Sequence, residues 1–201
     1  MIAIIDYGAG NIFSVKNALD FLGLENTLVS DVQSVKSADA VILPGVGAFP
    51  AAMEKLRASG LVDAIIDEAH RKPFLGICLG MQVIFEKGYE FGECDGLGLI
   101  SGSVRKMEEP DLIIPHMGWN KLEKLNDCAL MKGIGDNEYV YFVHSYKAHC
   151  DDGNISAYVE YGGRVPALVH DGAYVYGCQF HPEKSGETGL KILRNFAELI
   201  K

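Results

Sequence analysis

Short apolar runs separated by helical patterns dominate the first half of the chain. Residues 2–5, 40–43 and 73–77 are almost continuously apolar, which is typical of strands buried on both faces of a sheet. Apolar residues then recur at helical spacing over three segments: about 12–22, 50–58 and 61–70. This alternation of buried strands and helices predicts a parallel sheet covered by helices on both faces.

The second half has a different pattern. Residues 88–102 are rich in glycine, which predicts a loop. Beyond them, several segments alternate apolar and polar positions, as half-exposed antiparallel strands do. The predicted strands cover residues 102–106, 138–144, 155–160, 167–169 and 174–180, and a last helix covers 187–201. We therefore expect one α/β domain over residues 1–201, with a mostly parallel central sheet, flanking helices and an additional antiparallel strand region.

Composition narrows the class of protein. The chain has 201 residues, of which 48% are hydrophobic, and this predicts a globular domain with a full core. A net charge of −9 argues against nucleic acid or an anionic membrane as partner, and no apolar run approaches the ~20 residues of a membrane span. The five cysteines are widely spaced and form no CxxC, and no signal peptide is evident. We expect no disulfide framework, no metal site and a reducing, cytoplasmic location.

The stretch Gly76-Ile77-Cys78-Leu79-Gly80 lies where a buried strand meets a helix predicted from residue 81 to 86. Glycines on both sides of Cys78 remove the β-carbons that would clash in a sharp turn, as in a nucleophile elbow. The first helical turn favours a thiolate, and the amide of Leu79 would point toward an oxyanion. A small buried cysteine is the alternative, and the motif alone does not decide between them.

His181 and Glu183 form the second candidate group, separated by Pro182. In an extended strand, residues two apart face the same side, so the carboxylate would hold the imidazole and stabilise its protonated form. With Cys78 they would make a Cys–His–Glu triad, although 103 residues separate Cys78 from His181. The alternatives are a histidine at a strand end and a solvated glutamate before the last helix.

Two glycine-containing loops follow predicted strands. Pro44-Gly45-Val46-Gly47 follows the strand at 40–43, so its amides would reach the same sheet edge as Cys78 and could supply a second oxyanion donor. An ordinary strand–helix turn is the alternative. The loop at residues 6–11 contains GxGN without the third glycine of a dinucleotide-binding motif, so we interpret it as a tight turn near the site.

Aromatic and amide residues cluster around His116, in PHMGWN, and around His144, in YFVHSY. Such clusters are typical of an interface or of the edge of a ligand site. A strand pair with aromatic cross-strand packing is the alternative. Of the other histidines, His70 is expected to end a helix, near its negative dipole end, and His149 and His170 are expected to be surface residues.

The motifs GICLGMQ and QFHPEKS resemble those of the class I, triad-type glutamine amidotransferases. Within that class, DYGAGN, LPGVG, PHMGWN and YFVHSY resemble the glutaminase subunit of imidazole glycerol phosphate synthase, and the resemblance spans residues 4–185. It implies that the Cys78 thiolate attacks the side-chain amide of L-glutamine and that His181, oriented by Glu183, protonates the departing ammonia. Water would then hydrolyse a γ-glutamyl thioester.

The resemblance also implies further site residues and a partner. Leu79, Val46 and Gly47 would supply oxyanion donors, and glutamine would be bound by Gly45, Gln82, Val143, His144 and Ser145. The remaining residues leave no room for a synthase domain, so the ammonia acceptor would be the cyclase subunit of a heterodimer, which makes imidazole glycerol phosphate and aminoimidazole carboxamide ribotide in histidine biosynthesis. No cofactor is implied. Contacts with the cyclase would include Asn11, Trp119, Asn120, Tyr141 and Lys184.

Three other functions stay open at this point. The chain could be the glutaminase of another synthase, such as those for anthranilate, guanylate or pyridoxal phosphate, which ammonia transfer to each partner would distinguish. It could be a cysteine hydrolase of peptides or other amides, which would ignore glutamine. It could also be a regulatory module with a vestigial triad, in which Cys78 would react with thiol probes no faster than Cys150.

Overall fold

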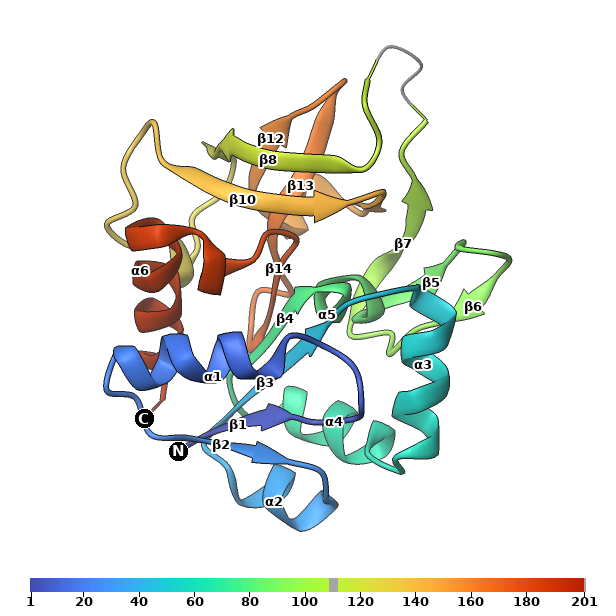
Figure 1. Ribbon diagram of the computed structural model, residues 1–201, viewed down its shortest axis with the longest axis vertical. Coiled ribbons are helices and arrows are strands. Elements are labelled where there is room, and N and C mark those ends of the chain that lie inside the picture. The colour runs from blue at the N-terminus through green and yellow to red at the C-terminus, as the bar shows by residue number, and fades with distance from the viewer. Residues whose placement is uncertain (109–111, 201) are drawn as a thin grey trace.

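A computed structural model describes residues 1–108 and 112–200 of the chain (Figure 1). An eight-stranded sheet forms its centre, and its first five strands in spatial order run parallel while the others pair antiparallel. This confirms the predicted fold class. In spatial order the strands are β2 (Asn26–Val29), β1 (Ile2–Ile5), β3 (Ala40–Gly45), β4 (Phe74–Cys78), β14 (Val175–Cys178), β13 (Arg164–His170), β12 (Ile155–Glu160) and β9 (Glu123–Lys124).

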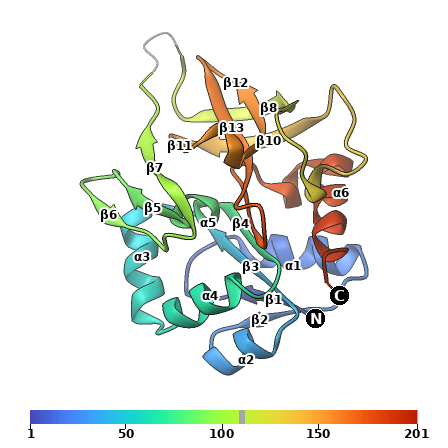
Figure 2. The same ribbon diagram turned by 180° about the vertical axis from the view of Figure 1, so that it is seen from behind.

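Helices cover both faces of the parallel part of this sheet, as Figures 1 and 2 show from opposite sides. Strand β1 makes the division visible, because Ile2 and Ile4 pack into one core cluster while Ala3 and Ile5 pack into the other. The first cluster includes residues of α1 (Ile12–Phe21) and α6 (Gly186–Ala197). The second includes residues of α2 (Val32–Ser37), α3 (Phe49–Ala58) and α4 (Val62–Ala69). A strand buried on both faces needs apolar residues at every position, which explains its unbroken apolar run.

Two smaller sheets lie at the carboxyl edge of the central one (Figure 1). One is the antiparallel pair of β8 (His116–Lys121) and β10 (Tyr139–His144). The other has the order β11-β7-β5-β6, from strands Tyr146–His149, Ile100–Lys106, Phe85–Gly88 and Cys94–Asp95. The remaining elements are the short helix α5 (Leu79–Val83) and the 3₁₀ turns η1 (Ala129–Met131), η2 (Asp152–Asn154) and η3 (Pro182–Lys184). The predicted strands at 102–106 and 138–144 lie in these two sheets, whereas those at 155–160, 167–169 and 174–180 correspond to β12, β13 and β14 of the central sheet.

Several element boundaries differ from the sequence prediction. The helix expected to continue to residue 86 is wrong, because α5 ends at Val83 and β5 begins at Phe85. The carbonyls of residues 83–86 accept hydrogen bonds from the amides of residues 96–99 and not from later residues of a helix, so the helix ends here. The same bonds order the glycine-rich stretch, which contains β6 and the start of β7. The last helix ends at Ala197, and Lys201 lies outside the described residues.

Further elements that the sequence pattern did not predict are β2, β9, β11 and α2. Strand β8 pairs with β10 and Trp119 contacts Tyr141 across the pair, which confirms the strand-pair alternative for the PHMGWN and YFVHSY clusters. Within the described ranges, no helix combines the length and the apolar character that a bilayer span requires.

Candidate active site

Cys78 occupies a strained turn at the end of β4. Its φ is 55° and its ψ is −111°, a backbone conformation rare for a residue with a side chain. The turn folds the next residues tightly against the strand, since a β-carbon at Gly76 would lie 2.6 Å from the carbonyl oxygen of Gly80. The glycines around Cys78 are therefore required by close backbone approach, as the sequence motif predicted.

His181 and Glu183 are paired directly. The Nδ1 atom of His181 lies 2.8 Å from Oε1 of Glu183, and their side chains are 3% and 1% exposed. The expected extended strand through these residues is wrong, because β14 ends at Cys178 and Glu183 lies in η3. The chain turns because the His181 carbonyl accepts hydrogen bonds from the Lys184 amide at 3.0 Å and the Ser185 hydroxyl at 2.6 Å. The turn, rather than strand alternation, brings the carboxylate to the imidazole.

Two neighbours control the charge of His181. Burial lowers the pKa of the imidazole, but hydrogen bonds to Cys78 and Glu183, together with the negative charges of those groups, outweigh burial and raise the pKa to about 9. The imidazole therefore carries a proton at neutral pH, next to the sulfur of Cys78. A protonated imidazole beside a thiol favours the thiolate, the nucleophilic form of cysteine.

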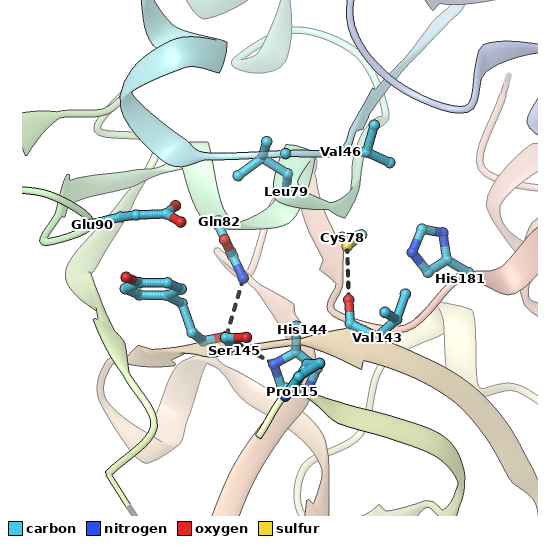
Figure 3. A pocket seen from close by; sticks show the side chains of 12 residues that line it. Val46, Cys78, Leu79, Gln82, Glu90, Pro115, Val143, His144, Ser145 and His181 are labelled. Atoms are coloured by element: carbon cyan, nitrogen blue, oxygen red, sulfur yellow. Dashed lines mark hydrogen bonds between the residues drawn. The ribbon is translucent and has the colours of Figure 1, made fainter. Parts of the chain in front are cut away.

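A cavity of about 310 Å³ opens at Cys78 and His181 (Figure 3). This volume lies at the lower end of the range for small-molecule sites. Most of the residues expected from the sequence to touch glutamine or the oxyanion line it: Val46, Gly47, Leu79, Gln82, Val143, His144 and Ser145. Gly45 does not line the cavity. It packs against the first turn of α5, where a β-carbon would lie 2.7 Å from the Gly80 amide nitrogen.

Two backbone segments that could donate to an oxyanion lie beside Cys78. Leu79 begins α5 immediately after the nucleophile, and Gly45 pairs in register with Cys78 across β3 and β4. This pairing brings the Val46–Gly47 turn to the same edge as the elbow. Gly47 has a φ of 97°, a conformation that glycine adopts without strain.

Gln82 is held in place by two acceptors. Its Nε2 atom donates to the backbone carbonyl of Tyr146 at 3.1 Å and to Oε1 of Gln179 at 3.0 Å. Gln179 in turn directs its Nε2 atom toward the sulfur of Cys78, 4.0 Å away. The carbonyl of Val143 lies 4.0 Å from the same sulfur. Residues 143–146, from the end of β10 to the start of β11, thus form another wall of the cavity.

Sequence reasoning missed Glu90, Tyr146 and Gln179. Glu90 brings a carboxylate into the cavity, and its Oε2 atom accepts a hydrogen bond from the amide of Phe49 at 2.7 Å (Figure 3). It lies in the glycine-rich stretch, whose composition carried no chemical signal. Tyr146 and Gln179 belong to the YFVHSY and QFHPEKS motifs, so their proximity to the site could have been anticipated.

The five residues expected at a partner interface come from segments that border one another. Trp119 on β8 is 54% exposed, and its ring centroid lies 6.0 Å from that of Tyr141 on β10. Tyr141 is bonded to the catalytic segment, because its carbonyl accepts from the His181 amide at 3.0 Å. Asn11 precedes α1, Lys184 is exposed in η3, and Asn120 turns inward toward His116.

Other candidate chemistry is sparse. The described part of the chain contains no group of three or more His, Cys, Asp or Glu side chains that could hold a metal ion. All five cysteines are free thiols. His70 and His149 are exposed, and His170 is half-buried.

Solved structures show what the fold resembles. A protein described as a glutamine amidotransferase aligns with a TM-score of 0.77 at 22% identity, covering 100% of this chain and 99% of that one. PurLQS from Thermotoga maritima aligns with a TM-score of 0.78 at 21% identity, covering 100% of this chain and 98% of that one. Both alignments support the fold described above.

Sequence comparison identifies the family. The family profile described as glutamine amidotransferase class-I matches residues 3–199. Proteins named imidazole glycerol phosphate synthase subunit HisH from Bacillus thuringiensis (strain Al Hakam) and Bacillus anthracis are 49% and 48% identical, over 100% of this chain and 96% of theirs. The chain belongs to the class I glutamine amidotransferase family.

Proposed function

We propose that this chain is the glutaminase subunit of an imidazole glycerol phosphate synthase, and that it passes ammonia to a separate cyclase subunit. The observation that carries the chemistry is a cysteine on a strained turn that shares a cavity with a buried His–Glu pair. The full-length relatives bear the name of that subunit, which supports the assignment within the family. The free cysteine thiols fit a reducing cytoplasm.

The first half of the reaction makes a thioester. The Cys78 thiolate adds to the side-chain amide carbon of glutamine, and the electron pair of the C=O bond moves to the oxygen. Amides of Leu79 and of the Val46–Gly47 turn stabilise this oxyanion. His181 then gives its proton to the amide nitrogen as the C–N bond breaks, so ammonia leaves and a γ-glutamyl thioester remains.

The second half regenerates the enzyme. His181, now neutral, takes a proton from water as the water oxygen adds to the thioester carbon. The oxyanion forms in the same place, and its collapse breaks the C–S bond to release glutamate and the thiolate. Glu183 keeps Nδ1 of His181 protonated throughout, so Nε2 is the atom that exchanges the proton.

The cavity also has groups for the amino-acid end of glutamine. Glu90 brings a negative charge suited to an ammonium group, and the carbonyls and amides of residues 143–146 offer further hydrogen bonds. Gln82 holds that segment through the Tyr146 carbonyl. We therefore assign Glu90 to the α-ammonium group, with Gln82, His144 and Ser145 around the rest of the ligand.

Glutamate release from glutamine tests the assignment. It is measured on the purified chain alone and with a cyclase subunit plus its nucleotide substrate. We expect release that rises with the partner and disappears in Cys78→Ala, while Cys150→Ala, a thiol outside the cavity, behaves as wild type. Release that is indifferent to this partner would move the search to another synthase, and no release under any condition would contradict the enzyme assignment.

The partner would dock over the exposed aromatic side of β8 and β10. Trp119 and Tyr139 are 54% and 51% exposed there, and η3, which carries the exposed Lys184, contacts both β10 and α1, the helix that Asn11 precedes. Trp119→Ala should weaken cyclase binding at least about fivefold, since truncated tryptophans at interface centres commonly cost over about 1 kcal/mol. Phe91→Ala is the control, because Phe91 is 88% exposed between β5 and β6. Equal binding by the two variants would remove Trp119 from the interface.

A further inference from the structure

Two buried histidines face each other between β8 and β10. His116 is 1% exposed and His144 is 6% exposed, and Nδ1 of His116 lies 2.9 Å from Nε2 of His144. Their strand positions are directly paired in the antiparallel register. The reaction described above assigns no role to His116. Because both rings are buried away from water, each of their nitrogen atoms requires a hydrogen-bond partner within the protein.

Which atoms donate in these hydrogen bonds follows from the Tyr146 carbonyl, at one end of the series. Nδ1 of His144 lies 2.8 Å from the backbone carbonyl oxygen of Tyr146, which can only accept, so Nδ1 carries the proton. Burial, helped by nearby His116, His181 and Lys147, lowers the pKa of His144 to about 3, although the hydrogen bond to the Tyr146 carbonyl acts in the opposite direction. The ring is therefore neutral, and its Nε2 atom is an acceptor for a proton on Nδ1 of His116.

The other nitrogen of His116 contacts a residue farther along the same strand, β8. Its Nε2 atom lies 2.8 Å from the side-chain amide of Asn120, whose Oδ1 faces the ring as placed. Burial lowers the pKa of His116 and outweighs the contact with Asn120, which raises it, so the ring is neutral; with its proton on Nδ1, Nε2 must accept. The two ends of an amide group are assigned from its hydrogen bonds, so we infer that the amide is turned over, with Nδ2 of Asn120 as the donor in place of Oδ1. The ring is also held by stacking, at centroid distances of 4.0 Å to Tyr161 and 4.8 Å to Phe142.

The series continues on the other side of Tyr146. The same carbonyl accepts from Gln82, which also donates to Gln179, whose Nε2 atom faces the Cys78 sulfur. A continuous series of hydrogen bonds thus connects Asn120, next to the exposed Trp119, to the nucleophile Cys78. The longest donor–acceptor distance in this series is the 4.0 Å from Gln179 to the Cys78 sulfur. Every side chain in this series other than Asn120 is at most 7% exposed, so water does not compete for these bonds.

We propose that His116 and Asn120 are positioning residues of the glutaminase site, which fix residues 143–146 against the ligand through a one-directional series of hydrogen bonds. His116 donates a hydrogen bond from Nδ1 to Nε2 of His144. This bond keeps the single ring proton of His144 on Nδ1, which donates to the Tyr146 carbonyl. Strand β8 therefore helps to set the position of the cavity wall formed by residues 143–146. The kinetic part of this proposal rests on the proposed function, whereas the proton positions do not.

Nitrogen-15 NMR of histidine-labelled protein tests the proton positions directly. In the wild-type chain, both His116 and His144 should be neutral at pH 7 with the proton on Nδ1. In Asn120→Asp the carboxylate cannot donate, so Nε2 of His116 must gain a proton and the ring should become cationic at pH 7. A proton on Nε2 of His116 in the wild-type chain would overturn the proposal, as would an unchanged ring in Asn120→Asp.

Glutaminase kinetics test the positioning role. His116→Phe keeps the stacking but leaves Nε2 of His144 without a donor, so KM for glutamine should rise about tenfold while kcat changes less than about threefold. His116→Asn, which places an amide N–H where Nδ1 was, should recover part of this loss. Tyr161→Phe keeps the ring stacked on His116 and removes only the hydroxyl that donates to the Ile113 carbonyl at 2.7 Å, outside this series, so it should keep the wild-type KM.

The outcomes separate the two proposals. A wild-type chain without glutaminase activity contradicts the proposed function, and the NMR result still decides the hydrogen-bond direction. Unchanged KM in a folded His116→Phe, with a wild-type unfolding midpoint, contradicts the positioning role alone. Equal loss in His116→Phe and Tyr161→Phe would also contradict it, because the effect would then not depend on the hydrogen bonds of His116.

Discussion

The carbonyl oxygen of Leu43 touches the α-carbon of Gly80 so closely that a β-carbon there would lie 1.8 Å from it. Leu43 belongs to β3, just before the Pro44–Gly47 loop, and Gly80 belongs to the first turn of α5. The contact presses the nucleophile turn onto the strand that carries the second oxyanion loop. Its tightness makes the geometry around Cys78 sensitive to a single methyl group.

Gly80→Ala should therefore destabilise the protein and disturb Cys78. Backbone must move to make room, and such overpacking commonly costs about 1–3 kcal/mol, so we expect a loss of ~3 kcal/mol or more here. Urea denaturation measures the loss. Gly153→Ala is the matched control, because nothing lies within 4 Å of its β-carbon position, and its effect should stay within about 0.5 kcal/mol. Equal stability of both variants would mean that the contact relaxes easily.

Glu183→Gln should separate charge from shape. The amide fills the same space but cannot stabilise a protonated His181, so kcat should fall roughly 10²–10⁴-fold, by analogy with other triads. Glu187→Gln, an exposed change at the start of α6, should leave kcat unchanged. Turnover is measured as glutamate release in both variants, and wild-type turnover in Glu183→Gln would remove the carboxylate from the mechanism.

The raised pKa of His181 predicts a pH-dependent stability. The folded pKa of about 9 exceeds the ordinary 6.5, so folding favours the protonated form. This stabilisation is complete below pH ~6.5 and is lost as pH rises through 9, and it amounts to at most about 3 kcal/mol. Urea unfolding at pH 6 to 9 should show this loss in wild type and not in His181→Gln.

Cys78→Ala should lower the pKa of His181. One of the two groups that raise it is removed, while burial, which lowers it, remains. An NMR titration of His181 in wild type and variant measures the difference, which we expect to exceed about one pH unit. An unchanged titration would show that Glu183 alone sets the pKa, and that the thiol and the imidazole are not electrostatically coupled.

Lys72 predicts a stability effect far from the site. Its Nζ atom lies 2.8 Å from Oε2 of the buried Glu68 and donates to the carbonyls of Lys36 and Ala38 at 2.9 and 2.6 Å. Lys72→Met removes the donor of those carbonyls and leaves the buried Glu68 carboxylate with only the exposed Arg71, 3.8 Å away, so the free energy of unfolding should fall by up to ~3 kcal/mol. The exposed Lys36→Met should change it by less than about 0.5 kcal/mol.

Buried strands and the elbow could be predicted from sequence because each depends on local chemistry. The unbroken apolar runs at β1, β3 and β4 follow from burial on both faces, and the glycines around Cys78 follow from backbone contact. Strands without a regular apolar pattern are harder to predict from sequence. Strand β8 contains His116, Gly118 and Asn120, and it is a strand because it pairs with β10.

Other features depend on contacts that no local pattern records. The end of α5 is set by amides of residues 96–99, and the place of Glu90 in the cavity is set by its bond to Phe49. The His181–Glu183 pair was predicted correctly as a contact but for the wrong reason, because a turn capped by Ser185 replaced the expected strand. The His116–His144 pair needed the strand register as well as the two motifs.

The bond between the Tyr141 carbonyl and the His181 amide has a consequence during protein synthesis. Chains are made from the N-terminus, so β1 to β4 and the nucleophile emerge long before His181. Until β14 has paired with β4, and the His181 amide with the Tyr141 carbonyl of β10, the cysteine lacks His181, which is both its base and its proton donor. A nascent or truncated chain therefore consumes no glutamine, and hydrolysis begins only when the last segment has folded.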